Sequence, residues 1–160
     1  MMKYLTSRTN TVVFTLLVSL GLTGCPSLFA QDSHTPVRLD ADKMAGINLT
    51  NVPNSYEDIL TDGTMNVRVG TLFDGNEIDV SIFESTGDGT TTHRDLPFRF
   101  EEFVYVLSGK LILTEPDGTR HEFTPGEGVV VPIGYVGDWS MEGTYRELVV
   151  TMNGNAGFRD

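Results

Sequence analysis

The chain has 160 residues, with 22 acidic side chains against 11 basic ones and a formal net charge of −11. Such an acidic chain repels phosphate backbones and anionic lipid surfaces, so we do not expect nucleic acid as a partner. The single cysteine, Cys25, cannot form a disulfide within the chain.

Residues 1–30 have the features of a signal peptide. Lys3 and Arg8 precede an uncharged apolar stretch from Val12 to Leu22, and polar and turn-forming residues follow it. This stretch is shorter than the roughly 20 residues that a membrane-spanning helix needs, so no transmembrane segment is expected.

Two cleavage sites compete at the end of this segment. Cleavage after Ala30 predicts a periplasmic or secreted protein. The alternative is a membrane-anchored lipoprotein acylated at Cys25, because Leu22 to Cys25 resembles a bacterial lipobox. We favour cleavage after Ala30, since Pro26 is an awkward residue beside a lipidated cysteine.

The rest of the chain predicts one all-β domain. Residues 31–61 have a weak pattern, in which only Ile47 to Val52 resembles a strand, and we interpret them as an N-terminal arm. Over residues 62–152, short runs of β-branched and aromatic residues alternate with turn residues, which is typical of an antiparallel β domain. Residues 153–160 are expected to form a tail.

Seven strands are predicted within this domain. They are Val67–Phe73, Ile78–Glu84, Phe103–Leu107, Lys110–Thr114, Thr119–Phe123, Gly128–Val131 and Arg146–Met152. Asp74–Gly75–Asn76 predicts a hairpin between the first two strands, because Asp-Gly readily adopts the positive φ angles of a tight turn. Ser108–Gly109 predicts a second turn, between the third and fourth strands.

Around residue 104 both faces of the predicted strand are apolar. One face carries Glu102, Val104 and Val106, and the other carries Phe103, Tyr105 and Leu107. A strand with water on one side would have polar residues there, so the second face needs a cover. The N-terminal arm or a partner subunit would supply it, and a homodimer is therefore one of our predictions.

Four segments stand out by their order and spacing. They are Ile82–Thr86, Glu102–Gly109, Pro125–Gly134 and Asp138–Trp139. Together they resemble the motifs of the cupin superfamily, in the branch of ureidoglycine aminohydrolase-like (cupin 3) domains. The resemblance implies an all-β fold, a single cupin-type jelly-roll barrel of antiparallel strands.

The resemblance also implies an incomplete metal site. In metal-binding members of the family, the first motif supplies two histidines and a glutamate, and the second supplies a third histidine. Glu102 occupies the glutamate position, but Phe98 and Gly137 stand where histidines are expected. Because catalytic metal sites generally need about three protein ligands, a divalent transition metal is not firmly implied. His93, in a loop expected to cross the barrel mouth, is the one candidate to complement Glu102.

A carboxylate facing the barrel interior needs a partner, because burying an unpaired charge costs several kcal/mol. Arg94 and Arg99 are the nearest cations in sequence, and a pair between Arg99 and Glu102 would either recognise a polar ligand or only close the barrel. Glu84 occupies a glutamate position of the resemblance, so it is either a second carboxylate at the mouth or a solvated strand end. The aromatic side chains of Tyr105 and Trp139 either line the pocket or fill the core.

Two functions follow from these alternatives. The favoured one is a secreted cupin that binds a small polar molecule in its barrel mouth without a firmly bound metal. Its ligand-binding residues would be Glu102, Arg99, Tyr105, Trp139 and Glu84. The alternative is a metal-dependent enzyme resembling ureidoglycine aminohydrolase, with Glu102 and His93 as metal ligands. The sequence identifies no catalytic residue.

Overall fold

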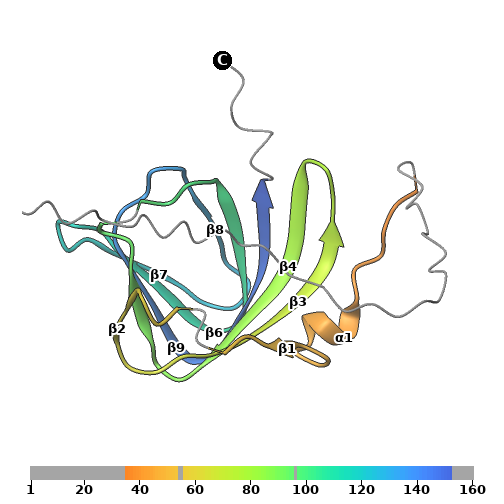
Figure 1. The fold of residues 1–160 in the computed structure, drawn as a ribbon, viewed down its shortest axis with the longest axis horizontal. Helices are drawn as coiled ribbons and strands as arrows, with labels where there is room; N and C mark the ends of the chain where they lie inside the picture. Colours follow the sequence, from red (N-terminus) through yellow and green to blue (C-terminus); the bar gives the residue numbers. More distant parts are fainter. Residues whose placement is uncertain (1–34, 54–55, 96, 153–160) are drawn as a thin grey trace, which may run out of the picture. The chain divides into compact units, whose positions relative to one another are not determined.

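The computed structural model describes residues 35–53, 56–95 and 97–152 (Figure 1). The predicted signal peptide, Cys25 and the tail lie outside the described residues. The helix and strands are α1 (Ala41–Met44), β1 (Thr50–Asn51), β2 (Leu60–Asp62), β3 (Asn66–Asp74), β4 (Ile78–Thr86), β5 (Thr90–Thr92), β6 (Glu102–Thr114), β7 (Arg120–Phe123), β8 (Gly128–Val131) and β9 (Asp138–Met152). No helix within the described ranges is long and apolar enough to cross a membrane.

The strands form one antiparallel sheet that curls on itself into a barrel, which confirms the predicted all-β jelly-roll fold (Figure 1). The two longest strands, β6 and β9, pair along most of their lengths and contribute to both halves of the barrel. In the first half the order is β1-β3-β4-β9-β6-β8. In the second half the order is β2-β5-β9-β6-β7, and β9 and β6 contribute their other ends to it.

The local turn chemistry explains one predicted hairpin and corrects the other. β3 and β4 pair around the turn at Gly75, as predicted, and Gly75 N donates to Ile78 O over 3.1 Å. The turn predicted at Ser108–Gly109 is wrong, because β6 continues through it and only its register with β9 shifts. Gly109 has φ 71°, and a Cβ there would lie 2.7 Å from Glu142 O. The glycine thus permits an irregular bend where β6 passes from one half of the barrel to the other.

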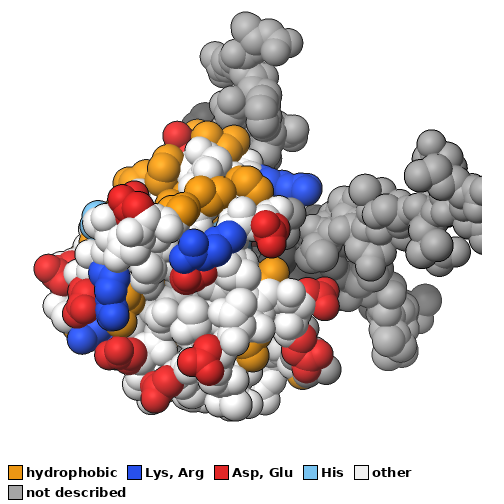
Figure 2. All heavy atoms as spheres, turned by 90° about the vertical axis from the view of Figure 1, so that its left-hand side faces the viewer, with side chains coloured by type: hydrophobic (Ala, Val, Ile, Leu, Met, Phe, Trp, Pro, Cys, Tyr) orange, Lys and Arg blue, Asp and Glu red, His pale blue; other side chains and the backbone are white. Residues whose placement is uncertain are grey.

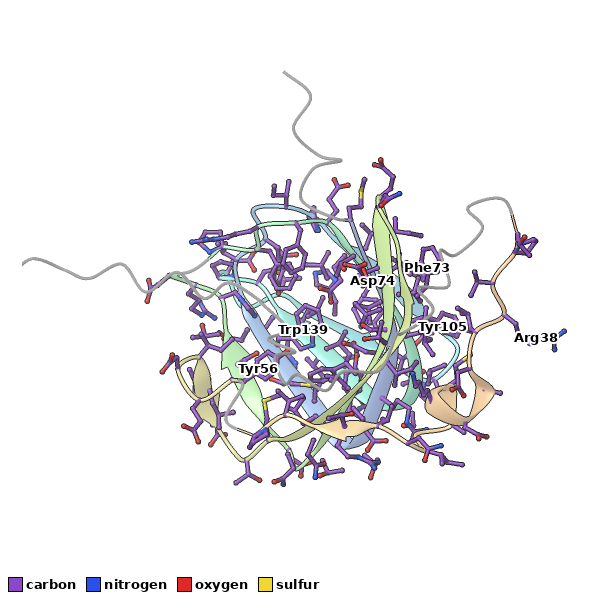
Figure 3. All side chains as sticks on the ribbon, turned by 45° about the vertical axis from the view of Figure 1, so that its right-hand side comes forward. Arg38, Tyr56, Phe73, Asp74, Tyr105 and Trp139 are labelled. Carbon is purple, nitrogen blue, oxygen red and sulfur yellow. The ribbon has the colours of Figure 1, made fainter. Side chains whose placement is uncertain are left out.

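The core lies between the two halves, and alternation along the strands decides which side chains reach it. Val104 and Val106 are fully buried in the main hydrophobic cluster, whereas Phe103 and Tyr105 point outward and are 40% and 39% exposed. Figure 3 shows Trp139 inside the barrel and Tyr105 on the outer side of the strands. The predicted two-faced pattern of this strand is therefore present in the fold.

The segment before β3 packs on the outer side of the barrel. Asp40 caps α1 by accepting hydrogen bonds from the backbone of Asp42 and Lys43. Lys43 Nζ then donates to Thr71 O over 2.8 Å, and Lys43 and Leu49 lie against Gly70 in β3. The segment covers part of the outer face of β3 and β4, but Phe103, Tyr105 and Val130 stay exposed.

Candidate functional site

Glu102 begins β6 and faces the barrel interior, on the same side of the strand as Val104 and Val106. Its side chain is only 9% exposed. No side chain of the described residues forms an ion pair or hydrogen bond with its carboxyl group. Because burial penalises the charged form, it raises the pKa of Glu102 from 4.5 to about 7.

A second carboxyl group, that of Glu147 in β9, lies in the same interior. Its register positions are opposite Phe83 in β4 and Val106 in β6, and it is 4% exposed. Burial and the negative charge of Glu102 raise the pKa of Glu147 to about 8, although the hydroxyl of Tyr145 donates a hydrogen bond to it. We call Glu102 and Glu147 the acid pair. Since two like charges disfavour each other in a low dielectric, the pair retains protons near neutral pH.

Two tyrosines accompany the acid pair. Tyr145 is completely buried, and burial together with the carboxylate of Glu147 raises its pKa, so its hydroxyl stays protonated. Tyr56 comes from the segment before β2, and burial followed by the charges of Glu147 and Glu102 also raises its pKa. Its ring contacts Phe83 edge-on, with centroids 5.7 Å apart, and Phe83 lies 6.4 Å from the Tyr145 ring. Figure 3 shows Tyr56 on the same side of the barrel wall as Trp139.

A hollow of about 330 Å³ adjoins Tyr56. Its walls come from the segments on either side of β2 and from the start of β3, namely Val52, Tyr56, Glu57, Leu60, Thr64, Met65, Asn66 and Val67. Val67 pairs with Ser85 in β4, and Ser85 pairs with Tyr145 in β9, so these three side chains share the inner face. The hydroxyl of Ser85 is fully buried and has no hydrogen-bond partner among the described residues. One wall of the hollow, at Val67, therefore belongs to the same inner face as the buried hydroxyl of Ser85.

Aromatic side chains line the opposite half of the barrel, at its mouth. Phe98 stacks on Trp139 with ring centroids 5.6 Å apart and planes inclined by 15°. His93 contacts Phe98 edge-on at 4.8 Å, and its backbone N donates to Gly137 O over 2.7 Å. Phe98 N also donates to Tyr135 O over 3.0 Å. His93 lies between β5 and β6, and its ring packs against those of Phe98 and Trp139.

The structure places three of the predicted ligand-binding residues, Glu84, Tyr105 and Arg99, outside this interior. Glu84 is 1% exposed but lies on the outer face of the sheet, where Arg68 and Arg146 both hydrogen-bond to its carboxylate. Burial acts to raise its pKa, but the hydrogen bonds from the two arginines outweigh it and lower the pKa. Tyr105 also points outward.

Neither arginine near residue 100 in the sequence pairs with Glu102. Arg99 is exposed and forms no ion pair within the described part of the chain. Arg94 instead holds Asp138 at the start of β9, with Nη2 to Oδ2 at 2.7 Å. The predicted pair between Arg99 and Glu102 is therefore replaced by an acid pair that lacks a basic partner among the described side chains.

The comparisons with known proteins agree with this fold. Residues 86–147 match the family described as the EutQ-like cupin domain. The EutQ protein of Clostridium difficile superposes with a TM-score of 0.53 and 20% identity, over 72% of this chain and 86% of that one. Residues 86–147 thus resemble a cupin domain, and they lie within a barrel of the cupin type. The superfamily predicted from the motifs is thus confirmed, and the narrower resemblance to ureidoglycine aminohydrolase stays a prediction.

A second solved structure shares the cupin fold. It is a protein of unknown function of the DUF861 family from Pseudomonas syringae pv. tomato, with a TM-score of 0.55 and 19% identity. The alignment covers 64% of this chain but only 43% of that chain, so this chain spans less than half the length of that relative. None of the curated proteins matches the sequence.

The structure has no room for one of the histidines that the resemblance places in a metal site. No group of three or more His, Cys, Asp or Glu side chains in the described ranges is arranged to hold a metal ion. At Gly137, where the second motif would place a histidine, a Cβ would lie 2.5 Å from both Thr114 O and the Tyr135 hydroxyl. Real Cβ atoms do not approach so closely, so a histidine cannot occupy this position without displacing the β6 backbone. We therefore derive no chemistry through a metal.

Sequence reasoning missed three residues of the candidate site, namely Tyr56, Tyr145 and Glu147. One signal was present in the strand that ends the domain, where Tyr145, Glu147 and Val149 alternate with Arg146 and Leu148. Had Val149 been assigned to the inner face, period-two alternation would have placed Glu147 beside it. Tyr56 had no such signal, because it lies in a segment without periodic pattern.

Proposed function

We propose that this cupin binds a small polar molecule inside its barrel, in contact with the acid pair and with the hydroxyls of Tyr145 and Tyr56. The observation that carries the proposal is Glu102, which is nine-tenths buried without a hydrogen-bonding partner among the described residues. A buried polar group that lacks a partner costs free energy, and a ligand that supplies one recovers it. The hollow of about 330 Å³ beside Tyr56 is of the size that holds small molecules.

The contrast with Glu84 supports this assignment. Glu84 is as inaccessible as Glu147, but two arginines neutralise it from neighbouring strands. The fold therefore has a means of compensating a buried carboxylate, and it uses that means on the outer face only. An acid pair kept without cations in the interior is instead suited to exchange protons and hydrogen bonds with a guest.

The expected location of the protein fits a binding role but is a proposal of its own. A signal peptide over residues 1–30 would deliver the barrel to the periplasm or the medium, and acylation at Cys25 would keep it at the membrane. N-terminal sequencing of the mature protein distinguishes these outcomes, because a chain that begins at Gln31 has lost Cys25.

Thermal unfolding in the presence of small polar compounds tests the binding proposal. A panel of short amines, alcohols, amides and carboxylic acids is added to the wild-type protein, to Glu102→Gln and to Glu101→Gln. A ligand present at about 100 times its Kd stabilises a protein by about 2.7 kcal/mol, which is readily measured as a rise in Tm. Glu101 is the adjacent but exposed glutamate and serves as the matched control.

We expect at least one class of compound to raise the Tm of the wild-type protein and of Glu101→Gln, but not that of Glu102→Gln. Equal shifts in all three proteins would place the ligand elsewhere. If no class of compound shifts the Tm of the wild-type protein, the proposed binding function fails.

A further inference from the structure

We infer that the ligand of this barrel is a small organic cation, such as a primary ammonium compound, held between the acid pair and the surrounding aromatic rings. This inference rests on the proposed binding function and specifies its ligand class. Three independent features of the structure support it.

The first feature is the charge of the site. Every ionisable side chain that acts on the acid pair from the packed strands is acidic or phenolic, namely Tyr145 on β9 and Tyr56 on the segment before β2. Glu57 at the wall of the hollow adds a third carboxylate, and His93 lies with the aromatic rings at the mouth. A cationic guest would supply the positive charge that Arg68 and Arg146 supply to Glu84 on the outer face.

The second feature is the lining. The rings of Tyr56, Phe83 and Tyr145 form a chain of contacts beside the acid pair, with centroids 5.7 Å and 6.4 Å apart. Aromatic faces attract ammonium groups, and the attraction grows when the cation is removed from water. The buried hydroxyl of Ser85 lies on the same inner face and lacks a partner in the part of the chain that the structure describes, so it offers an additional acceptor for an ammonium hydrogen.

The third feature is the surface. The chain carries a net charge of −11, and Figure 2 shows acidic side chains spread over the visible face. Such a potential raises the local concentration of cations and lowers that of anions. The long-range field and the interior therefore select for the same sign of charge.

Proton release gives the inference a specific signature. The acid pair holds protons near neutral pH, and a bound cation favours the ionised carboxylates. Binding should therefore release protons to the buffer and should become tighter as the pH rises through neutrality. A neutral guest would not release protons in this way, and an anionic guest would show the opposite dependence on pH.

Three compounds of equal length separate these outcomes, namely propylammonium, propan-1-ol and propionate. Their affinities are measured by NMR titration in a chelator-containing buffer, at about pH 6 and about pH 8.5, on either side of the range in which the pair titrates. Proton release is measured by calorimetry in buffers of different ionisation enthalpy. The proteins are the wild type, Glu102→Gln, Glu147→Gln and the control Glu101→Gln, each checked for folding by circular dichroism.

We expect propylammonium to bind about tenfold or more tightly than propan-1-ol at the higher pH. This preference should be lost in Glu102→Gln and retained in Glu101→Gln, so that the result stands even if Glu147→Gln fails to fold. If propan-1-ol binds as tightly as propylammonium, or propionate binds more tightly, the inference that the ligand is a cation is refuted and the binding function stands. If none of the three compounds binds, both proposals fail at this site. A requirement for added Zn²⁺ would also overturn the inference, in favour of a metal site.

Discussion

The substitution Glu102→Gln tests whether the interior carboxyl is protonated in the folded protein. It removes one ionisable group, keeps the shape of the side chain and does not disturb any described hydrogen bond. The pKa of Glu102 is raised by burial from 4.5 to about 7. Between these values the folded protein holds a proton that the unfolded chain has lost. The stability from the neutral carboxyl is therefore fully present below pH 4.5 and is lost as the pH rises through 7.

The size of this effect follows from the shift. One pKa unit corresponds to about 1.4 kcal/mol, so the displacement of Glu102 is equivalent to about 3 kcal/mol of unfolding free energy. The wild-type protein should lose about this amount between mildly acidic and mildly alkaline pH, in addition to the contribution of Glu147. In Glu102→Gln the loss should be smaller by about 3 kcal/mol. The substitution also removes the negative charge that raises the pKa of Glu147. The contribution of Glu147 to the loss of stability should therefore decrease as well.

Urea unfolding followed by far-ultraviolet circular dichroism, from about pH 4.5 to about pH 9, measures these free energies. Glu101→Gln is the control, since the side chain of Glu101 is exposed and its removal should leave the pH dependence unchanged. If Glu102→Gln and the wild-type protein lose the same free energy over this range, Glu102 is ionised in the native state and the reasoning about the acid pair is refuted.

Three further predictions concern the frame around the site. Arg146→Met should lower the unfolding free energy by about 3 kcal/mol in urea titrations, because Glu84 is then left buried with one cation fewer; a loss below about 1 kcal/mol would contradict this. Gly137→His should lower the Tm without gaining stabilisation from Zn²⁺, and a zinc-dependent rise in Tm would contradict the steric argument. The wild-type protein should sediment as a homodimer through its exposed outer face, and Phe103→Ser with Val130→Ser should shift it to monomer. A monomeric wild-type protein would disprove the dimer.

The sequence predicted the features of the fold that depend on local pattern. Period-two alternation placed Val104 and Tyr105 on opposite faces of one strand, and an Asp-Gly turn at Gly75 located the first hairpin. The expectation that Tyr105 lines the pocket or fills the core was wrong, because its face of the strand is the outer one. The turn predicted at Ser108–Gly109 was wrong because a glycine with positive φ is found in turns and in bulges alike. Only the continued pairing of β6 with β9, which is a contact distant in sequence, distinguishes the two.

The candidate site was less predictable, because its residues come from segments far apart in the chain. Glu102 was found through a motif, but its neighbour Glu147 depends on the register between β6 and β9. Glu84 was expected either at the mouth or at a solvated strand end, and its burial on the outer face was missed because its partners could not be foreseen. Arg68 and Arg146 lie 16 and 62 residues away from it, on the two strands that flank β4. Such compensation depends on strand order, which the sequence does not state.

The stacking of Phe98 on Trp139 has a practical consequence. Trp139 is the only tryptophan of the chain, and its ring lies parallel to a ring from the segment that leads into β6. A guest that enters past Phe98, or displaces it, changes the surroundings of the single indole. The intrinsic fluorescence of the unlabelled protein is therefore an optical reporter of events at the barrel mouth, with Phe98→Leu as the variant that should silence its response.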